Sequence, residues 1–100
     1  MKVLRDMKTP LVKNLEIKLT KKFSPKFLNI IDESHKHAGH AGIDESGKET
    51  HFKVIMVSAS FANLSRMERH RMVHHAISKE IKLIHSISLA LFTPEEKKEE

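Results

Sequence analysis

The C-terminal half of the chain carries two strand patterns separated by a helix pattern. Runs rich in β-branched and other apolar residues occupy Thr50–Ser58 and Ile84–Phe92. Between them, apolar residues of Leu64–Lys82 recur at helical spacing. Two strands that flank one helix are typical of a crossover between parallel strands.

Alternation along each predicted strand assigns its side chains to two faces. The row expected to lie against the helices consists of Phe52, Val54, Met56, Ile87, Leu89 and Leu91, with His85 at its head. The row expected to face water in the last strand consists of Ser86, Ser88 and Ala90. The apolar stripe of the long helix centres on Val73, with Met72, Ala76, Ile77 and Ile81 beside it.

Element lengths predict where the ends of this unit lie. At about 1.5 Å per helical residue and about 3.3 Å per strand residue, the helix and the preceding strand each span roughly 28 Å. The helix can therefore return the chain to the edge at which the first strand began. This predicts His51 and His85 at one edge of the sheet, with the start of the helix (Arg66, Arg69 and His70) at the opposite edge.

The N-terminal half predicts a helix, a strand and a long loop. Thr9-Pro10 is typical of a helix start, and Ser24-Pro25 breaks the pattern. A basic amphipathic helix can bind a membrane surface, but we favour packing on the protein's own sheet and expect no membrane partner. Lys26–Ser34 predicts a strand, and the loop His35–Lys48 is expected to join it to an antiparallel neighbour.

The combined pattern predicts an α+β fold of the α/β-sandwich type. Its order is α-β-β-α-β, followed by a short C-terminal helix that Thr93-Pro94 predicts. The helices are expected on one face of a three-stranded mixed sheet. We expect a flexible lead at residues 1–8, a single domain at 9–96 and a flexible charged tail at 97–100.

Composition restricts the chemistry. The chain has 100 residues, a formal net charge of +5 and no cysteine. A basic protein can bind nucleic acid or an acidic partner, or can have no electrostatic target at all. Without thiolates it cannot hold a cysteine-ligated metal cluster by itself.

No apolar run is long enough to span a bilayer. We expect a cytoplasmic, bacterial-type protein, and the basic N-terminus suggests a mitochondrial location as the alternative.

Two groups of residues are candidate sites. The first combines the loop histidines His35, His37 and His40 with His85, and spaced histidines of this kind can bind a metal such as zinc. The alternative without a metal is that the loop histidines are solvated polar residues and that His85 is an ordinary residue at a strand end. No motif for hydrolysis or group transfer is present, so we expect no enzyme activity.

The second group is the basic start of the long helix: Arg66, Arg69, His70 and Arg71. Positive charge at a helix N-terminus is unfavourable because it opposes the helix dipole. Its presence indicates that these residues bind phosphates or an acidic partner. A solvated charged first turn, with Glu68 interleaved, explains the pattern equally well. The helical pair His70 and His74 has metal-binding spacing, although most such pairs bind nothing.

Four segments in order resemble the BolA family: Glu33–Gly42, Glu49–Val54, Arg69–His74 and Ile84–Ile87. The resemblance covers about Pro10 to Glu95. It implies a fold related to the type II KH domain and a heterodimer with a monothiol glutaredoxin. In that complex a [2Fe–2S] cluster is shared with the glutaredoxin and glutathione during iron–sulfur cluster assembly or trafficking, and the isolated protein binds none.

The resemblance also implies ligand positions. His85 matches the family histidine that opens the last strand, although its neighbours Ile84, Ser86 and Ile87 differ from the usual ones. The second ligand matches His37 by counting from Glu33, while His40 stays open. Family members described as transcriptional regulators keep DNA as an alternative partner, and a homodimer is compatible with the sequence.

Overall fold

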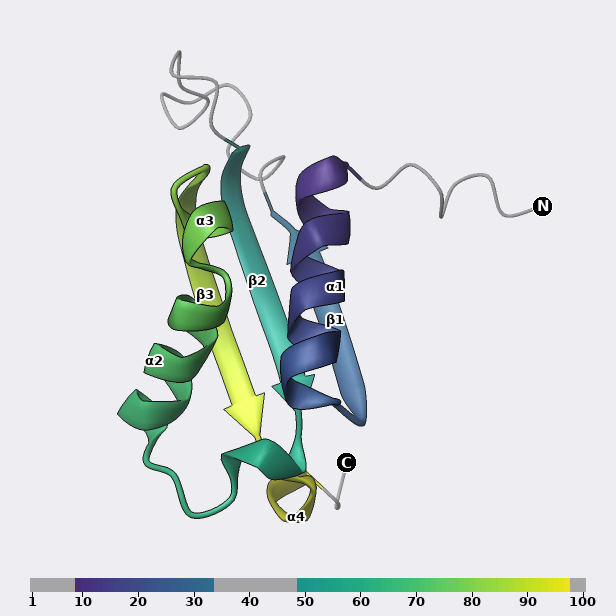
Figure 1. Ribbon diagram of the computed structural model, residues 1–100, viewed down its shortest axis with the longest axis vertical. Coiled ribbons are helices and arrows are strands. Elements are labelled where there is room, and N and C mark those ends of the chain that lie inside the picture. Colours follow the sequence, from purple (N-terminus) through teal and green to yellow (C-terminus); the bar gives the residue numbers. More distant parts are fainter. Residues whose placement is uncertain (1–8, 34–48, 98–100) are drawn as a thin grey trace, which may run out of the picture.

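The computed structural model describes residues 9–33 and 49–97 of the protein (Figure 1). The elements in chain order are α1 (Pro10–Phe23), β1 (Phe27–Asp32), β2 (Glu49–Val57), the 3-10 helix η3 (Ala59–Phe61), α2 (Arg66–Ala76), α3 (Ser78–Ile81), β3 (Ile84–Phe92) and α4 (Pro94–Lys97). The predicted α+β class and element order are confirmed. None of the helices in the described part is long and apolar enough to cross a membrane.

The sheet has the order β1-β2-β3. β1 pairs with β2 in antiparallel fashion, and β2 pairs with β3 in parallel, as predicted. Helices α1, α2 and α3 lie on one face of the sheet, and α4 lies at the end where β2 and β3 finish (Figure 1). The start of α2 is therefore at the opposite end of the sheet from the start of β3.

Register explains which side chains are buried. Phe52 pairs with Ile87, Val54 with Leu89 and Met56 with Leu91, so the two strands present one continuous apolar row to the helices. The helices complete the core with Leu11, Val12, Leu15, Leu19, Phe23, Phe61, Val73 and Ile77. Burial of this apolar surface is the main stabilising contribution to the fold.

The ends of α1 are fixed by local chemistry. The Thr9 side chain accepts a hydrogen bond from the Val12 amide at 3.2 Å, and Pro10 occupies the first turn. Ser24 ends the helix in the left-handed conformation, with φ of 44°. The Phe23 carbonyl then accepts a hydrogen bond from buried Ser58 Oγ at 2.6 Å, which ties this end of α1 to the end of β2.

The expectation of one continuous helix over Leu64–Lys82 is wrong. The segment forms α2 and α3, separated at Ile77, whose φ and ψ of −115° and 32° leave the helical region. Ile77 is fully buried, and its amide still donates to the Val73 carbonyl. The break keeps Ile77 in the core, and α3 then brings Glu80 to Lys18 of α1, where the Lys18 Nζ lies 3.0 and 2.9 Å from the two carboxylate oxygens.

The starts of two strands also differ from expectation. β1 is shorter than Lys26–Ser34, and its first residue, Phe27, is half exposed. In β3, buried Ile84 belongs to the core whereas His85 is exposed. His85 therefore does not head the core-facing row: the alternation that holds for Ile87, Leu89 and Leu91 does not extend back to the first residues of the strand.

Candidate functional site

Two histidines meet where β2 and β3 begin. The rings of His51 and His85 stack with centroids 5.4 Å apart and planes inclined by 14°. His51 is half-buried, whereas His85 is exposed. The parallel pairing of β2 and β3 produces this contact, since it places the first residues of both strands at one edge. The prediction that His51 and His85 share an edge is confirmed.

The two described residues that flank the predicted histidine loop lie at this same edge. The Glu33 amide donates to the His51 carbonyl at 2.8 Å, and Glu49 pairs with Ile84. The loop candidates His35, His37 and His40 lie outside the described residues. Their expected role as ligands therefore stays a prediction.

The described histidines do not make a complete metal site. Within residues 9–33 and 49–97, no group of three or more histidine, aspartate or glutamate side chains is placed to hold a metal ion. His85 can nevertheless offer an exposed imidazole to an ion or cluster whose other ligands come from elsewhere. This donor set fits a shared cluster, because imidazole is an accepted ligand in a [2Fe–2S] centre that also has thiolates.

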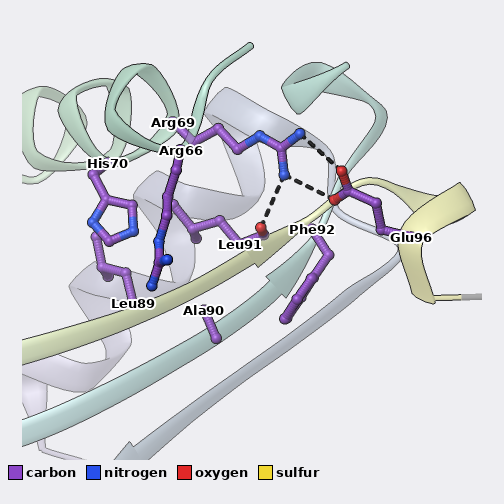
Figure 2. Close-up of a pocket in the computed structure, with 8 residues that line it drawn as sticks. All are labelled: Arg66, Arg69, His70, Leu89, Ala90, Leu91, Phe92 and Glu96. Carbon is purple, nitrogen blue, oxygen red and sulfur yellow. Dashed lines mark hydrogen bonds and ion pairs between the residues drawn. The ribbon is translucent and has the colours of Figure 1, made fainter. Parts of the chain in front are cut away.

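The opposite end of β3 forms a basic hollow of about 580 Å³, lined by Arg66, Arg69, His70, Leu89, Ala90, Leu91, Phe92 and Glu96. Figure 2 shows Arg66 and His70 extending from α2 toward β3. The side chains of Leu89 and Leu91 turn toward the helix, whereas those of Ala90 and Phe92 turn away (Figure 2). The hollow therefore lies between α2 and the outer edge of the sheet, and three of the predicted basic residues line it.

Arg69 donates four hydrogen bonds within its own chain. Its Nη1 and Nη2 donate to the two carboxylate oxygens of Glu96 at 2.8 and 3.1 Å (Figure 2). Nη1 also donates to the Leu91 carbonyl, and Nε to the Leu64 carbonyl, each at 3.1 Å. The guanidinium lies 5.9 Å from the centre of the Phe61 ring. Arg69 thus joins the start of α2, the end of β3 and α4.

This contact shifts two pKa values. The hydrogen bonds from Arg69, followed by that from the Thr93 amide, lower the pKa of Glu96 to about 2. The same Glu96 carboxylate raises the pKa of Arg69. In the neighbouring part of the hollow, burial lowers the pKa of His70, and the charges of Arg66 and His74 lower it further. These effects favour the neutral form of His70.

Arg71 does not line this hollow. It lies on an adjoining surface of α2 that is lined by Arg66, Met67, His70, Arg71 and His74. The four predicted basic residues therefore divide into the exposed cations Arg66 and Arg71, the half-buried His70 and the ion-paired Arg69. Sequence reasoning missed Glu96 as the partner of Arg69. The available signal was Thr93-Pro94, which predicts a helix start and so places the Glu96 carboxylate in the first turn of that helix.

Sequence reasoning also missed the capping box that counteracts the unfavourable positive charge at the start of α2. The Ser65 side chain accepts from the Glu68 amide at 3.1 Å, and the Glu68 side chain accepts from the Ser65 amide at 2.8 Å. This capping box satisfies two free amides and places a negative charge in the first turn. The spacing Ser65-Arg66-Met67-Glu68 was the available signal.

The sequence is similar to those of known proteins over most of its length. The family model described as BolA-like protein matches residues 19–96. The chain belongs to the BolA-like family. It is 41% identical over 83 residues to a Haemophilus influenzae protein named DNA-binding transcriptional regulator BolA, covering 82% of this chain and 76% of that protein. It is also 41% identical to Protein BOLA1, chloroplastic, of Arabidopsis thaliana, covering 79% of this chain and 51% of that one.

A solved structure supports the same assignment. The BolA domain of SufE1 from Arabidopsis thaliana matches with a TM-score of 0.77 and 32% sequence identity, covering 89% of this chain and 98% of that domain. The name of the bacterial relative describes a regulator rather than an enzyme. The BolA-like family and its fold are thereby confirmed.

Proposed function

We propose that this BolA-like protein is a non-enzymatic adaptor that pairs with a monothiol glutaredoxin and shares a [2Fe–2S] cluster with it and with glutathione. The observation that carries the proposal is exposed His85, which stacks on His51 at the edge where Glu33 and Glu49, the described residues on either side of the histidine loop in the sequence, also lie. His85 is the first proposed ligand, and His37 or His40 is the second.

The chemistry of the chain agrees with a shared cluster. Because the sequence has no cysteine, every thiolate must come from a partner or from glutathione. The stacked ring of His51 restricts where the His85 imidazole can lie. An exposed ligand at the start of a strand, such as His85, can contact a metal held by a second protein while the core of this domain stays packed.

The test is reconstitution of the complex. The protein is mixed with a monothiol glutaredoxin, glutathione, iron and sulfide under anaerobic conditions, and visible absorption and circular dichroism are recorded. We expect a heterodimer whose spectrum differs from that of the glutaredoxin cluster alone. A spectrum identical to that of glutaredoxin alone, or a preference for zinc by the isolated protein, would contradict the proposal.

Loop variants identify the second ligand. We expect His37→Ala or His40→Ala, but not both, to weaken the spectrum of the complex, because the proposal requires one loop imidazole in addition to His85. If both variants kept the spectrum of the unmodified complex, neither His37 nor His40 would be the second ligand. Their thermal unfolding should match that of the unmodified protein.

A second function, nucleic-acid binding, is favoured by Arg66 and Arg71. These exposed cations flank His70 on one surface of α2, and a relative is named as a DNA-binding regulator. Phosphate contacts make affinity fall steeply with salt, with a slope of about −0.9 per neutralised phosphate on duplex DNA. We expect Arg66→Ala and Arg71→Ala each to reduce that slope by about 1. A weak, uniform affinity that neither variant changes would rule this function out.

A further inference from the structure

The outer edge of β3 is an open sheet edge beside a cation. β3 is nine residues long and pairs only with β2 among the described strands. Long open edges attract other strands, and proteins usually shorten, cover or charge them. Here Leu89, Ala90, Leu91 and Phe92 line the basic hollow, so this part of the edge is accessible (Figure 2).

Two hydrogen bonds fix which backbone groups face outward. The Phe92 carbonyl accepts from the Ser58 amide at 2.9 Å and so points toward β2. The Leu91 carbonyl accepts from Arg69 Nη1 and so points away from β2. Because the N–H and C=O groups of successive strand residues alternate in direction, the groups of Ile87 and Leu89 and the N–H of Leu91 point to the open edge.

Charge in the hollow is uneven. Arg69 and Glu96 neutralise each other through a two-armed ion pair. His70 has a lowered pKa. Arg66 is exposed and has no carboxylate partner within the described residues. The hollow therefore presents one uncompensated positive charge beside a row of outward backbone donors and acceptors.

We propose that the outer edge of β3 binds an extended acidic peptide segment of a partner protein by strand addition. The segment forms backbone hydrogen bonds with Leu89 and Leu91, and one of its carboxylates pairs with Arg66. The bond from Arg69 to the Leu91 carbonyl closes one end of the edge, which limits how far the added strand extends. This surface lies at the opposite end of β3 from His85, so its occupation does not depend on the cluster ligands.

Charge selects this occupant over a second copy of the chain. Pairing of β3 with β3 of another copy would bring two uncompensated Arg66 side chains and two chains of net charge +5 together. An acidic strand instead supplies the missing negative charge.

The experiment uses the full chain and a blocked synthetic peptide of about six residues that alternates valine and glutamate, the length being that of a typical strand. Binding is followed by amide hydrogen exchange. We expect new protection at Leu89 and Leu91, whose N–H groups face outward. The amides of Ser88 and Ala90, which face β2, serve as internal controls and should not change.

Three comparisons make the result decisive. A peptide of the same sequence with N-methylated backbone amides should bind poorly, because it keeps the charge and loses the backbone donors. A valine–lysine peptide should not bind. Arg66→Ala should weaken binding about three- to fivefold, as expected for an exposed ion pair, whereas Arg71→Ala on the adjoining surface should change it less.

Several outcomes would overturn the proposal. They are equal binding of the N-methylated peptide, protection confined to the β1 edge, and protection of Leu89 and Leu91 by an oligonucleotide but not by the peptide. Protection of the same amides by self-association without any peptide, detected by sedimentation, would assign the edge to a second copy instead.

Discussion

Glu80 places a carboxylate in the interior between α1 and α3. Its residue is 5% exposed, whereas the Lys18 side chain that meets it is 38% exposed. A buried charge destabilises the fold unless it is paired, so Lys18 contributes to stability mainly by pairing with the Glu80 carboxylate. The sequence alone did not reveal this pair, because its members are 62 residues apart and Lys18 looks like one of several solvated lysines.

We expect Lys18→Met to lower the free energy of unfolding by about 1–2 kcal/mol, since it leaves the Glu80 carboxylate without its ion-pair partner. Lys22→Met, at an exposed position in the last turn of α1, should be nearly neutral. Adding Glu80→Leu to Lys18→Met should recover stability. Chemical denaturation measures all three, and an equal loss for Lys18→Met and Lys22→Met would show that the pair contributes nothing specific.

Arg69 shows how one residue can be placed correctly and still have an unforeseen role. It was predicted to belong, with Arg66 and His70, to the basic start of the long helix, and all three line the hollow. Its ion pair with Glu96 depends on how the end of β3 leads into α4. That is a tertiary contact across 27 residues, which periodicity does not encode.

At the scale of elements, alternation in the strands was the most informative signal. It predicted the row of Phe52, Val54 and Met56 against Ile87, Leu89 and Leu91, which register and burial confirm. It failed at the first residues of β3, where Ile84 is in the core. Helical periodicity likewise did not reveal the break at Ile77, because Val73 and Ile77 keep the spacing of an uninterrupted helix.

The two faces of β3 should respond differently to charge. We expect Leu89→Asp, which puts a carboxylate on the helix-covered face, to cost about 2–4 kcal/mol or to unfold the domain. Ser88→Asp, one residue away on the exposed face, should be mild. Thermal unfolding followed by circular dichroism compares them, and equal tolerance would contradict the strand assignment.

The attachment of α4 should depend on pH. The folded pKa of Glu96, about 2, lies below its ordinary value near 4.5, so its contribution to stability is complete above that ordinary value. The contribution is lost as the pH falls toward 2. We expect Glu96→Gln to lower the melting temperature at pH 7, and the difference from the unmodified protein to shrink between about pH 5 and pH 2. A difference that is constant with pH would exclude the Arg69–Glu96 pair as its cause.

At the scale of the whole molecule, the crossover separates two chemically different ends. The stacked His51 and His85 lie where β3 begins, and the basic hollow lies where it finishes. Element lengths alone predicted this separation. The histidine loop, the KH-like relationship, the glutaredoxin partner and the cellular location stay predictions.

The most direct test of the proposed function is His85→Ala in the reconstituted complex. The side chain is exposed, so the variant should stay folded and lose no more than about 1 kcal/mol of stability. His75→Ala, an exposed histidine in the last turn of α2 rather than on a strand, is the matched control. We predict that His85→Ala abolishes the distinctive visible circular dichroism of the glutaredoxin complex or shortens the lifetime of its cluster, with apo association affected less, while His75→Ala changes neither. A folded His85→Ala protein whose complex keeps the same spectrum and lifetime would contradict the assignment of His85 as a ligand.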